Sequence, residues 1–190
     1  MSDVTETEIV VIGGGAVGCG VAYSLAEAGK TDVVVVEREP TVGSVTTAQA
    51  VGLVGQVRSS VERVRLAMWS VAEFSRMESD PEARPGWRQV GSLRVAITEE
   101  RAEEFRRLQG VADEAGLEVH LIPASDAARK WPAMDFGKAT AVLWCPTDGY
   151  VQPHDLTMAY YRLSRRRGVR YLTNTAVREI SVEGGRVRAV

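Results

Sequence analysis

The first forty positions alternate short apolar runs with glycines and one amphipathic segment. Residues 8–12 and 32–36 are rich in β-branched side chains and show no polar alternation, which is typical of strands covered on both faces. Between them, residues 17–28 have the pattern of a helix that ends near Gly29. A strand, a helix and a second strand within so short a stretch predict parallel pairing through a right-handed crossover.

Further along, the pattern continues to alternate between helices and strands. Residues 40–57 are rich in Gly, Ser, Thr and Ala and have no clear period, so we expect an irregular segment that is either functional or disordered. A loop is expected over residues 146–153. The pattern predicts helices from Ser59, over 98–116, after Ser125 and over 156–167, and strands over 90–98, 117–122, 139–143, 170–172, 177–182 and 186–190.

Composition narrows the class of protein. The 190 residues carry a formal net charge of −2, so the charge balance favours neither nucleic acid nor an anionic membrane as a partner. The two cysteines, Cys19 and Cys145, are too few for a disulfide framework and suit a reducing, cytoplasmic compartment. Residues 1–8 lack the pattern of a targeting signal. The last predicted strand runs to the end of the chain, which we interpret as the N-terminal portion of a longer protein.

The strongest motif is the glycine-rich stretch over residues 13–18, which has the form G-x-G-x-x-G. Gly13 would permit the tight turn out of the strand, Gly15 would let the backbone approach a pyrophosphate, and Gly18 would let the helix pack against the strand. The amino end of the helix, at Ala16 and Val17, then offers N–H groups and a positive dipole end to phosphates. This motif is weak alone, but here it lies between a strand and a helix, as its mechanism requires.

Glu37 follows the second strand, 24 positions after Gly13. A carboxylate at that place can accept hydrogen bonds from both hydroxyls of an adenosine ribose and would repel the 2′-phosphate of NADP. The residues alone leave FAD and NAD open. The small residues over 43–52 favour FAD, because backbone amides and hydroxyls can lie there against a large flat ligand.

Three segments carry a resemblance to a known family: residues 34–53, the stretch from Gly86 to Gly91, and residues 145–153. They are similar to the D-amino-acid oxidase superfamily of FAD-dependent oxidoreductases, nearest its sarcosine and dimethylglycine dehydrogenase branch. Residues 52–58 resemble the stretch that follows the flavin-linking histidine of that branch. Gln49 stands where the branch has this histidine, and we therefore expect non-covalent FAD.

The resemblance also implies roles for individual residues. Glu37 and Arg38 would contact the ribose, Gly52 and Leu53 would pass near the isoalloxazine ring, and Val177 would touch the adenine through its backbone. The residues expected to line the pyrophosphate and flavin side are Ser44, Thr46 and Thr47.

The expected fold class is α/β: a Rossmann-like FAD-binding domain with the start of an interleaved antiparallel-sheet substrate domain, truncated at its C-terminus. Residues 1–80 would form the FAD-binding part, 81–145 would contribute to the substrate domain, and 146–190 would return to the FAD-binding domain.

The expected function is oxidation of the C–N bond of a small N-methylated amine or amino acid, with oxygen or an electron-transfer protein as electron acceptor. A non-catalytic or incomplete FAD-binding module and an NAD-dependent dehydrogenase are the alternatives. No catalytic residue is assigned, and no metal site is expected. Asp148 is interpreted as a turn residue rather than a base, and Arg165–Arg167 as cations that complement a helix dipole.

Overall fold

The structure is a computed structural model that describes residues 6–190. The chain folds into two compact units. Unit 1 contains the described part of Met1–Gly52 together with Met77–Gly86 and Gln152–Val190, and unit 2 contains Leu53–Arg76 and Trp87–Val151. The two units are therefore interleaved along the chain. The domain boundaries expected at residues 80 and 145 stay a prediction.

A parallel sheet of three strands forms the centre of unit 1. Its order is β1 (Ile9–Ile12), β2 (Val33–Val36) and β9 (Arg170–Leu172). The central strand β2 consists of four valines, and all four are buried. The expectation of a strand covered on both faces is correct for β2 but wrong for β1. Three side chains of β1 are partly buried and Ile12 is 51% exposed, and β1 has a strand neighbour on one side only within the described chain.

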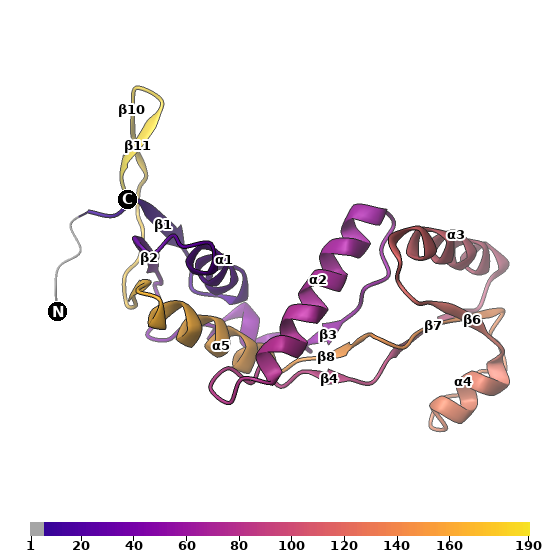
Figure 1. Cartoon of the computed structure of the whole chain (residues 1–190). Helices are drawn as coiled ribbons and strands as arrows, with labels where there is room; N and C mark the ends of the chain where they lie inside the picture. Colours follow the sequence, from indigo (N-terminus) through magenta and orange to yellow (C-terminus); the bar gives the residue numbers. More distant parts are fainter. Residues whose placement is uncertain (1–5) are drawn as a thin grey trace. The chain divides into compact units, whose positions relative to one another are not determined.

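Two helices of unit 1 lie side by side, α1 (Ala16–Glu27) and α5 (Pro153–Arg166) (Figure 1). Their contact includes the rings of Tyr23 and Tyr160, whose centroids are 5.2 Å apart. Small residues of α1, among them Ala22, pack on the valines of β2. Helix α5 begins three residues earlier than the pattern predicted, because a proline at the first helical position needs no hydrogen-bond partner for its nitrogen.

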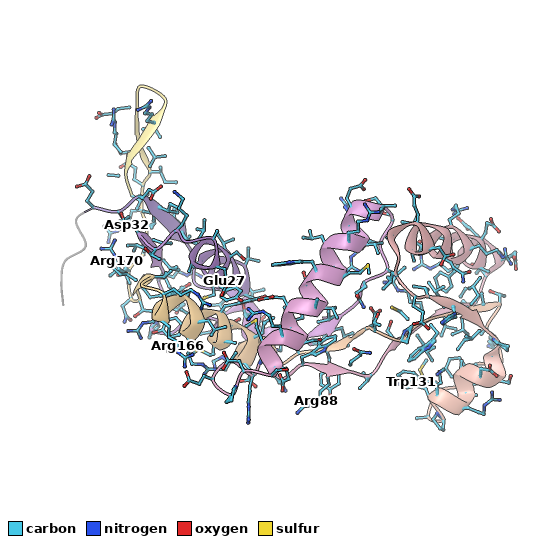
Figure 2. The ribbon with its side chains drawn as sticks, in the orientation of Figure 1. Glu27, Asp32, Arg88, Trp131, Arg166 and Arg170 are labelled. Atoms are coloured by element: carbon cyan, nitrogen blue, oxygen red, sulfur yellow. The ribbon has the colours of Figure 1, made fainter. Side chains whose placement is uncertain are left out.

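The basic residues at the end of α5 form specific contacts in addition to the expected dipole interaction. Arg166 forms an ion pair with Glu82, and Arg167 forms one with Glu27 at 2.5 Å. Figure 2 labels Arg166 and Glu27. Arg165 lies over the ring of Tyr161, 5.4 Å from its centroid.

The last part of unit 1 is a hairpin of β10 (Ser181–Glu183) and β11 (Arg186–Ala189), which Figure 1 draws in yellow. The strands expected over 177–182 and 186–190 pair as this hairpin, but the first of them is wrong for residues 177–180, which are irregular. The backbone upstream bonds to another loop instead: Asn174 and Thr175 donate to the carbonyl oxygens of Glu39 and Glu37.

Unit 2 is built on an antiparallel sheet of β5 (Ser92–Ala96), β7 (Ala141–Cys145) and β6 (His120–Ile122), with β7 in the middle. Alternate residues of β7 enter different cores, because neighbouring side chains of a strand point to opposite faces. Leu143 packs with the buried face of α3 (Glu99–Ala115), and Val142 packs with residues from the region of α4 (Ala124–Lys130). The start of α3 is confirmed, since the Thr98 hydroxyl accepts from the amide of Arg101 at 3.3 Å.

A second, small antiparallel sheet in unit 2 joins β3 (Leu53–Val54), β8 (Gly149–Tyr150) and β4 (Arg88–Gln89). Its middle strand β8 corrects the prediction of an uninterrupted loop over 146–153. Most of α2 (Val61–Glu78) also belongs to unit 2, and a short 3-10 helix η1 (Thr46–Gln49) belongs to unit 1. None of the helices within residues 6–190 combines the length and the apolar character needed to cross a bilayer.

Candidate functional site

A pocket of about 320 Å³ lies in unit 1, beside the carboxyl ends of β1 and β2. Of the residues expected to bind a nucleotide, it is lined by Gly13, Gly15, Glu37, Arg38, Ser44, Thr46, Thr47 and Val177. Its remaining lining residues are Ile12, Val36, Gly43, Val45, Thr175 and Ala176. Because ligands of open α/β sheets bind outside the carboxyl ends of the strands, this is the place where a nucleotide pocket is expected.

The glycine-rich turn forms one wall of the pocket. Gly13 has a φ of +100°, which side-chain-bearing residues rarely adopt, and its amide donates to the carbonyl oxygen of Val36 at 2.8 Å. A Cβ atom on Gly18 would collide with the carbonyl oxygen of Gly13. Gly18 is therefore required for the packing of α1 against the turn.

Gly15 differs from these two glycines, since a Cβ atom there would meet Thr47 Oγ1 at 3.4 Å, an ordinary contact. The protein leaves room for a methyl group at this position.

The amino end of α1 begins directly after this turn. Gly15 is the N-cap residue and has no side chain to cap the helix, and the first turn contains no acidic residue. The amide of Ala16 donates to Thr47 Oγ1 at 3.1 Å, and the side chain of Val17 is 82% exposed. The positive end of the helix dipole is thus available to an anion such as a diphosphate.

Glu37 lies at the tip of β2 with both carboxylate oxygens oriented by backbone amides. Oε2 accepts from Gly14 N at 2.6 Å, and Oε1 accepts from Glu39 N at 2.8 Å. Each oxygen has a further lone pair. The carboxylate can therefore accept two more hydrogen bonds, one at each oxygen, from a pair of neighbouring hydroxyls.

The opposite wall combines two segments that are far apart in the sequence. Gly43 approaches the turn, and its amide donates to Gly14 O at 2.9 Å. After β9, Asn174 adopts a φ of 54°, and Thr175 N donates to Glu37 O at 2.9 Å. Asparagine tolerates the left-handed conformation, so Asn174 was a sequence signal for a turn at this place. The sequence pattern suggested a strand nearby and did not identify Thr175 and Ala176 as lining residues.

The sequence model of the FAD dependent oxidoreductase family matches residues 8–190. The chain belongs to this family. The cofactor of these FAD-dependent oxidoreductases is consistent with the pocket, since Glu37 offers acceptors for a ribose diol and α1 offers a diphosphate an amino end with no acidic residue in its first turn. The earlier alternative of NAD is excluded by this assignment.

Relatives within the family confirm the resemblance seen in the sequence. The chain is 30% identical to 4-methylaminobutanoate oxidase (formaldehyde-forming) from Paenarthrobacter nicotinovorans, over 98% of this chain and 22% of that protein. It is 35% identical to mitochondrial dimethylglycine dehydrogenase from Rattus norvegicus, over 86% of this chain and 19% of that protein. The chain therefore spans about a fifth of the length of these relatives.

Among solved structures, L-proline dehydrogenase from P. horikoshii superposes with a TM-score of 0.89 at 28% identity. The match covers 96% of this chain and 48% of that one. This match confirms the α/β fold class of the FAD-dependent oxidoreductases, with its parallel sheet and its additional antiparallel sheets.

Several residues expected to bind FAD lie outside the lining of the pocket. Gly18 packs inside the turn, while Ala16 and Val17 are in the first turn of α1. Gln49 is the exposed last residue of η1, and Gly52 follows it with a φ of 73°. Leu53 belongs to unit 2, where it is 80% exposed.

The cysteines and histidines do not assemble a reactive centre. Burial raises the pKa of both Cys19 and Cys145 to about 11, so both thiols are protonated at neutral pH. His120 contacts Glu118 at 2.8 Å on the surface. Within residues 6–190, no cluster of His, Cys, Asp and Glu could hold a metal ion.

Asp148 has a role in unit 2 that its interpretation as a turn residue did not include. The side chain is fully buried, with Oδ1 accepting from Gln56 N at 2.8 Å and from Gln56 Nε2 at 3.1 Å. Oδ2 accepts from the Ser92 hydroxyl at 2.6 Å. Its backbone carbonyl accepts from the amides of Val90 and Gly91. Asp148 therefore connects the segment after β3 to β5.

Proposed function

We propose that the full-length protein oxidises the C–N bond of a small N-methylated amine or amino acid, similar to sarcosine or dimethylglycine, with FAD as the oxidant. Two relatives support this substrate class, since both are named for N-methylated amino acids. One of them is also named as forming formaldehyde.

The observation that carries the cofactor part of the proposal is the pairing of Glu37 with the glycine-rich turn. The two backbone amides orient the carboxylate for the ribose diol, and the absence of a side chain at Gly15 would let the diphosphate approach the backbone. Arg38 would contact the ribose, and Ser44, Thr46 and Thr47 would contact the pyrophosphate side, while Val177 would meet the adenine. The roles proposed for Gln49, Gly52 and Leu53 near the flavin ring rest on the resemblance alone.

The proposed reaction removes a hydride equivalent from the carbon next to nitrogen. FAD supplies the two-electron oxidising chemistry when bound. Water then hydrolyses the resulting imine, which releases formaldehyde and the demethylated amine when the oxidised carbon is an N-methyl group. Oxygen or an electron-transfer protein would accept the electrons in the second half of the cycle. The cytoplasmic location rests on the sequence alone and stays a prediction.

We also propose that FAD is held without a covalent bond. The side-chain amide of Gln49 offers no nucleophile at the position where related sequences carry the flavin-linking histidine. Acid precipitation of the purified protein should therefore leave the flavin in the supernatant, as measured by its absorbance and fluorescence. Flavin retained in the washed pellet would contradict non-covalent attachment.

The decisive experiment uses the full-length protein with its FAD. Under anaerobic conditions, addition of dimethylglycine, sarcosine or 4-methylaminobutanoate should bleach the flavin absorbance, and an added electron acceptor should permit turnover with formaldehyde release. A yellow protein that no secondary or tertiary amine bleaches would instead support a non-catalytic FAD-binding module. This alternative is retained because the chain spans only about a fifth of the length of these two relatives.

A further inference from the structure

The glycine-rich turn of unit 1 is held at Gly14 by three different segments. The amide of Gly14 donates to Glu37 Oε2 at 2.6 Å, and its carbonyl oxygen accepts from the amide of Gly43 at 2.9 Å. The third partner is a side chain of α1, because Cys19 Sγ donates to the same carbonyl oxygen at 3.4 Å. One residue of the turn therefore connects the acid at the tip of β2, the segment that leads to η1, and α1.

The thiol of Cys19 is protonated and is placed by a hydroxyl group from β9. Burial raises the pKa of Cys19 to about 11, against a smaller opposing effect of a hydrogen bond with Tyr171. The thiol therefore keeps its proton at neutral pH and can donate it to Gly14 O. The Tyr171 hydroxyl in turn lies 2.8 Å from Ser164 Oγ of α5.

These groups form a buried polar network that runs from α5 through β9 to α1 and ends at the turn. The side chains of Cys19 and Ser164 are fully buried. The ring of Tyr171 is also held by the ring of Tyr161, with the centroids 4.6 Å apart. A satisfied buried network restricts the groups that it joins, and such supporting contacts keep a binding residue in its productive geometry.

We propose that Cys19 is a positioning residue for FAD, whose thiol holds Gly14 and thereby keeps Glu37 in the geometry that binds the nucleotide. Cys19 does not belong to the lining of the pocket, so it would act only through the turn. A buried cysteine that merely fills space behaves as a small apolar residue, whereas this role depends on the hydrogen bond. The inference goes beyond the proposed function, because it rests on the cofactor and on no particular substrate.

The first test separates the hydrogen bond from the volume of the side chain. Cys19→Ala removes the donor, whereas Cys19→Ser keeps a donor in a similar volume. Fluorescence titration of the full-length apoprotein with FAD would compare the two. Cys19→Ala should raise the dissociation constant of FAD about three- to tenfold, as expected for the loss of one hydrogen bond. Cys19→Ser should stay within about twofold of wild type.

The matched control is Cys145→Ala. Cys145 is also a buried thiol whose pKa is raised to about 11 by burial, but it lies on β7 in unit 2. The same change of side chain is thus made in a second core. Both alanine variants should lower the melting temperature of the apoprotein, since each leaves space in a core. Only Cys19→Ala should weaken FAD binding, which a merely structural role would not produce.

A further substitution tests the network from its other side. Tyr171→Phe keeps the ring that packs on Tyr161 and removes the hydroxyl that contacts the thiol. It should weaken FAD binding about twofold or more. The double variant Cys19→Ala/Tyr171→Phe should bind FAD no more weakly than Cys19→Ala, because the hydroxyl acts on the turn through the thiol. Tyr171→Phe decides the question should Cys19→Ala fail to fold.

Three results would overturn the positioning role: wild-type FAD affinity in a folded Cys19→Ala, equal losses for Cys19→Ser and Cys19→Ala, or additive losses in the double variant. The outcome is independent of amine oxidation. If the donor at Cys19 governs FAD affinity in a protein whose flavin no amine bleaches, the positioning role stands and the proposed function is wrong.

Discussion

The carboxylate of Glu37 accepts a hydrogen bond from the amide of Gly14 at 2.6 Å, so the acidic residue at the tip of β2 is held against the glycine-rich turn that follows β1. The two residues are 23 positions apart in the sequence. Parallel pairing of β1 with β2 brings their ends together. The hydrogen bond fixes the position of the acceptor before a nucleotide arrives, which lowers the ordering cost of binding.

We expect Glu37→Gln to weaken FAD binding. The glutamine amide group would face the N–H of Gly14 or of Glu39 and could not accept from both. Hydrogen bonds to a charged group contribute about 1.5–3 kcal/mol, so the dissociation constant of FAD should rise about 10- to 100-fold. Fluorescence titration of the full-length apoprotein with FAD would measure it.

Glu39→Gln is the control for this change. It keeps the backbone amide that donates to Glu37 and removes a carboxylate that forms an ion pair with Arg38 at 3.2 Å. FAD affinity should stay within about twofold of wild type, as expected for a half-exposed ion pair. Equal affinities for wild type and Glu37→Gln would show that the carboxylate does not hold the ribose.

Two glycines of α1 provide a second test, because they differ in what a methyl group would meet. Gly18→Ala places a Cβ atom against the carbonyl oxygen of Gly13, whereas Gly20→Ala meets Tyr160 at 3.4 Å, an ordinary contact. We expect Gly18→Ala to cost about 2 kcal/mol or more and to lower the FAD content. Gly20→Ala should be neutral or stabilising by up to about 1 kcal/mol.

The melting temperature and the flavin content of the two full-length variants would measure both effects. Similar behaviour of Gly18→Ala and Gly20→Ala would contradict the close approach of α1 to the turn.

Asp148 provides a test of stability in unit 2. Asp148→Ala would leave the amide and side chain of Gln56 and the hydroxyl of Ser92 without their buried acceptor. We expect a loss of about 3–5 kcal/mol, or failure to fold, because unpaired buried donors are costly. The control Asp113→Ala removes an exposed carboxylate from α3 and should change stability by less than about 0.5 kcal/mol. Equal melting temperatures for the two variants would overturn the role assigned to Asp148.

The lowered pKa of Asp32 predicts that the stability of the fold depends on pH. Figure 2 labels Asp32 and Arg170, which form an ion pair at 2.7 Å. The pKa of Asp32 is lowered, first by the hydrogen bond from the amide of Glu8 and further by Thr7 and Arg170. Because the folded pKa lies below the unfolded one, this stabilisation is fully present above about pH 4–5 and is lost as pH falls through the folded pKa.

The difference in melting temperature between wild type and Asp32→Asn should therefore shrink as the pH is lowered from about 6 to about 3. The control is Asp80→Asn, a change at another carboxylate of unit 1 for which no Arg or Lys ion pair is found within the described residues. If the difference in melting temperature between wild type and Asp32→Asn did not change with pH, the proposed contribution of Asp32 ionisation to stability would be excluded.

Much of the fold could be read from local patterns. The four valines of β2 predicted a buried strand, and the structure confirms it. Thr98 and Gly116 marked the two ends of α3, because a hydroxyl cap and a left-handed glycine act within one helical turn. Prediction failed where a partner distant in the sequence decided the conformation, as for residues 177–180, which follow a backbone bonded to Glu37 and Glu39.

The sequence by itself determined the βαβ unit, the glycine-rich turn and the acid at the tip of β2, because each depends on conformational preferences within a few residues. Only the tertiary structure decided that Thr175 and Ala176 complete the nucleotide pocket, that Asp148 is buried as an acceptor, and that Cys19 and Gly43 converge on one carbonyl. The physical reason is that hydrogen bonding and charge balance between distant segments depend on strand pairing, and no local pattern encodes which segments will meet.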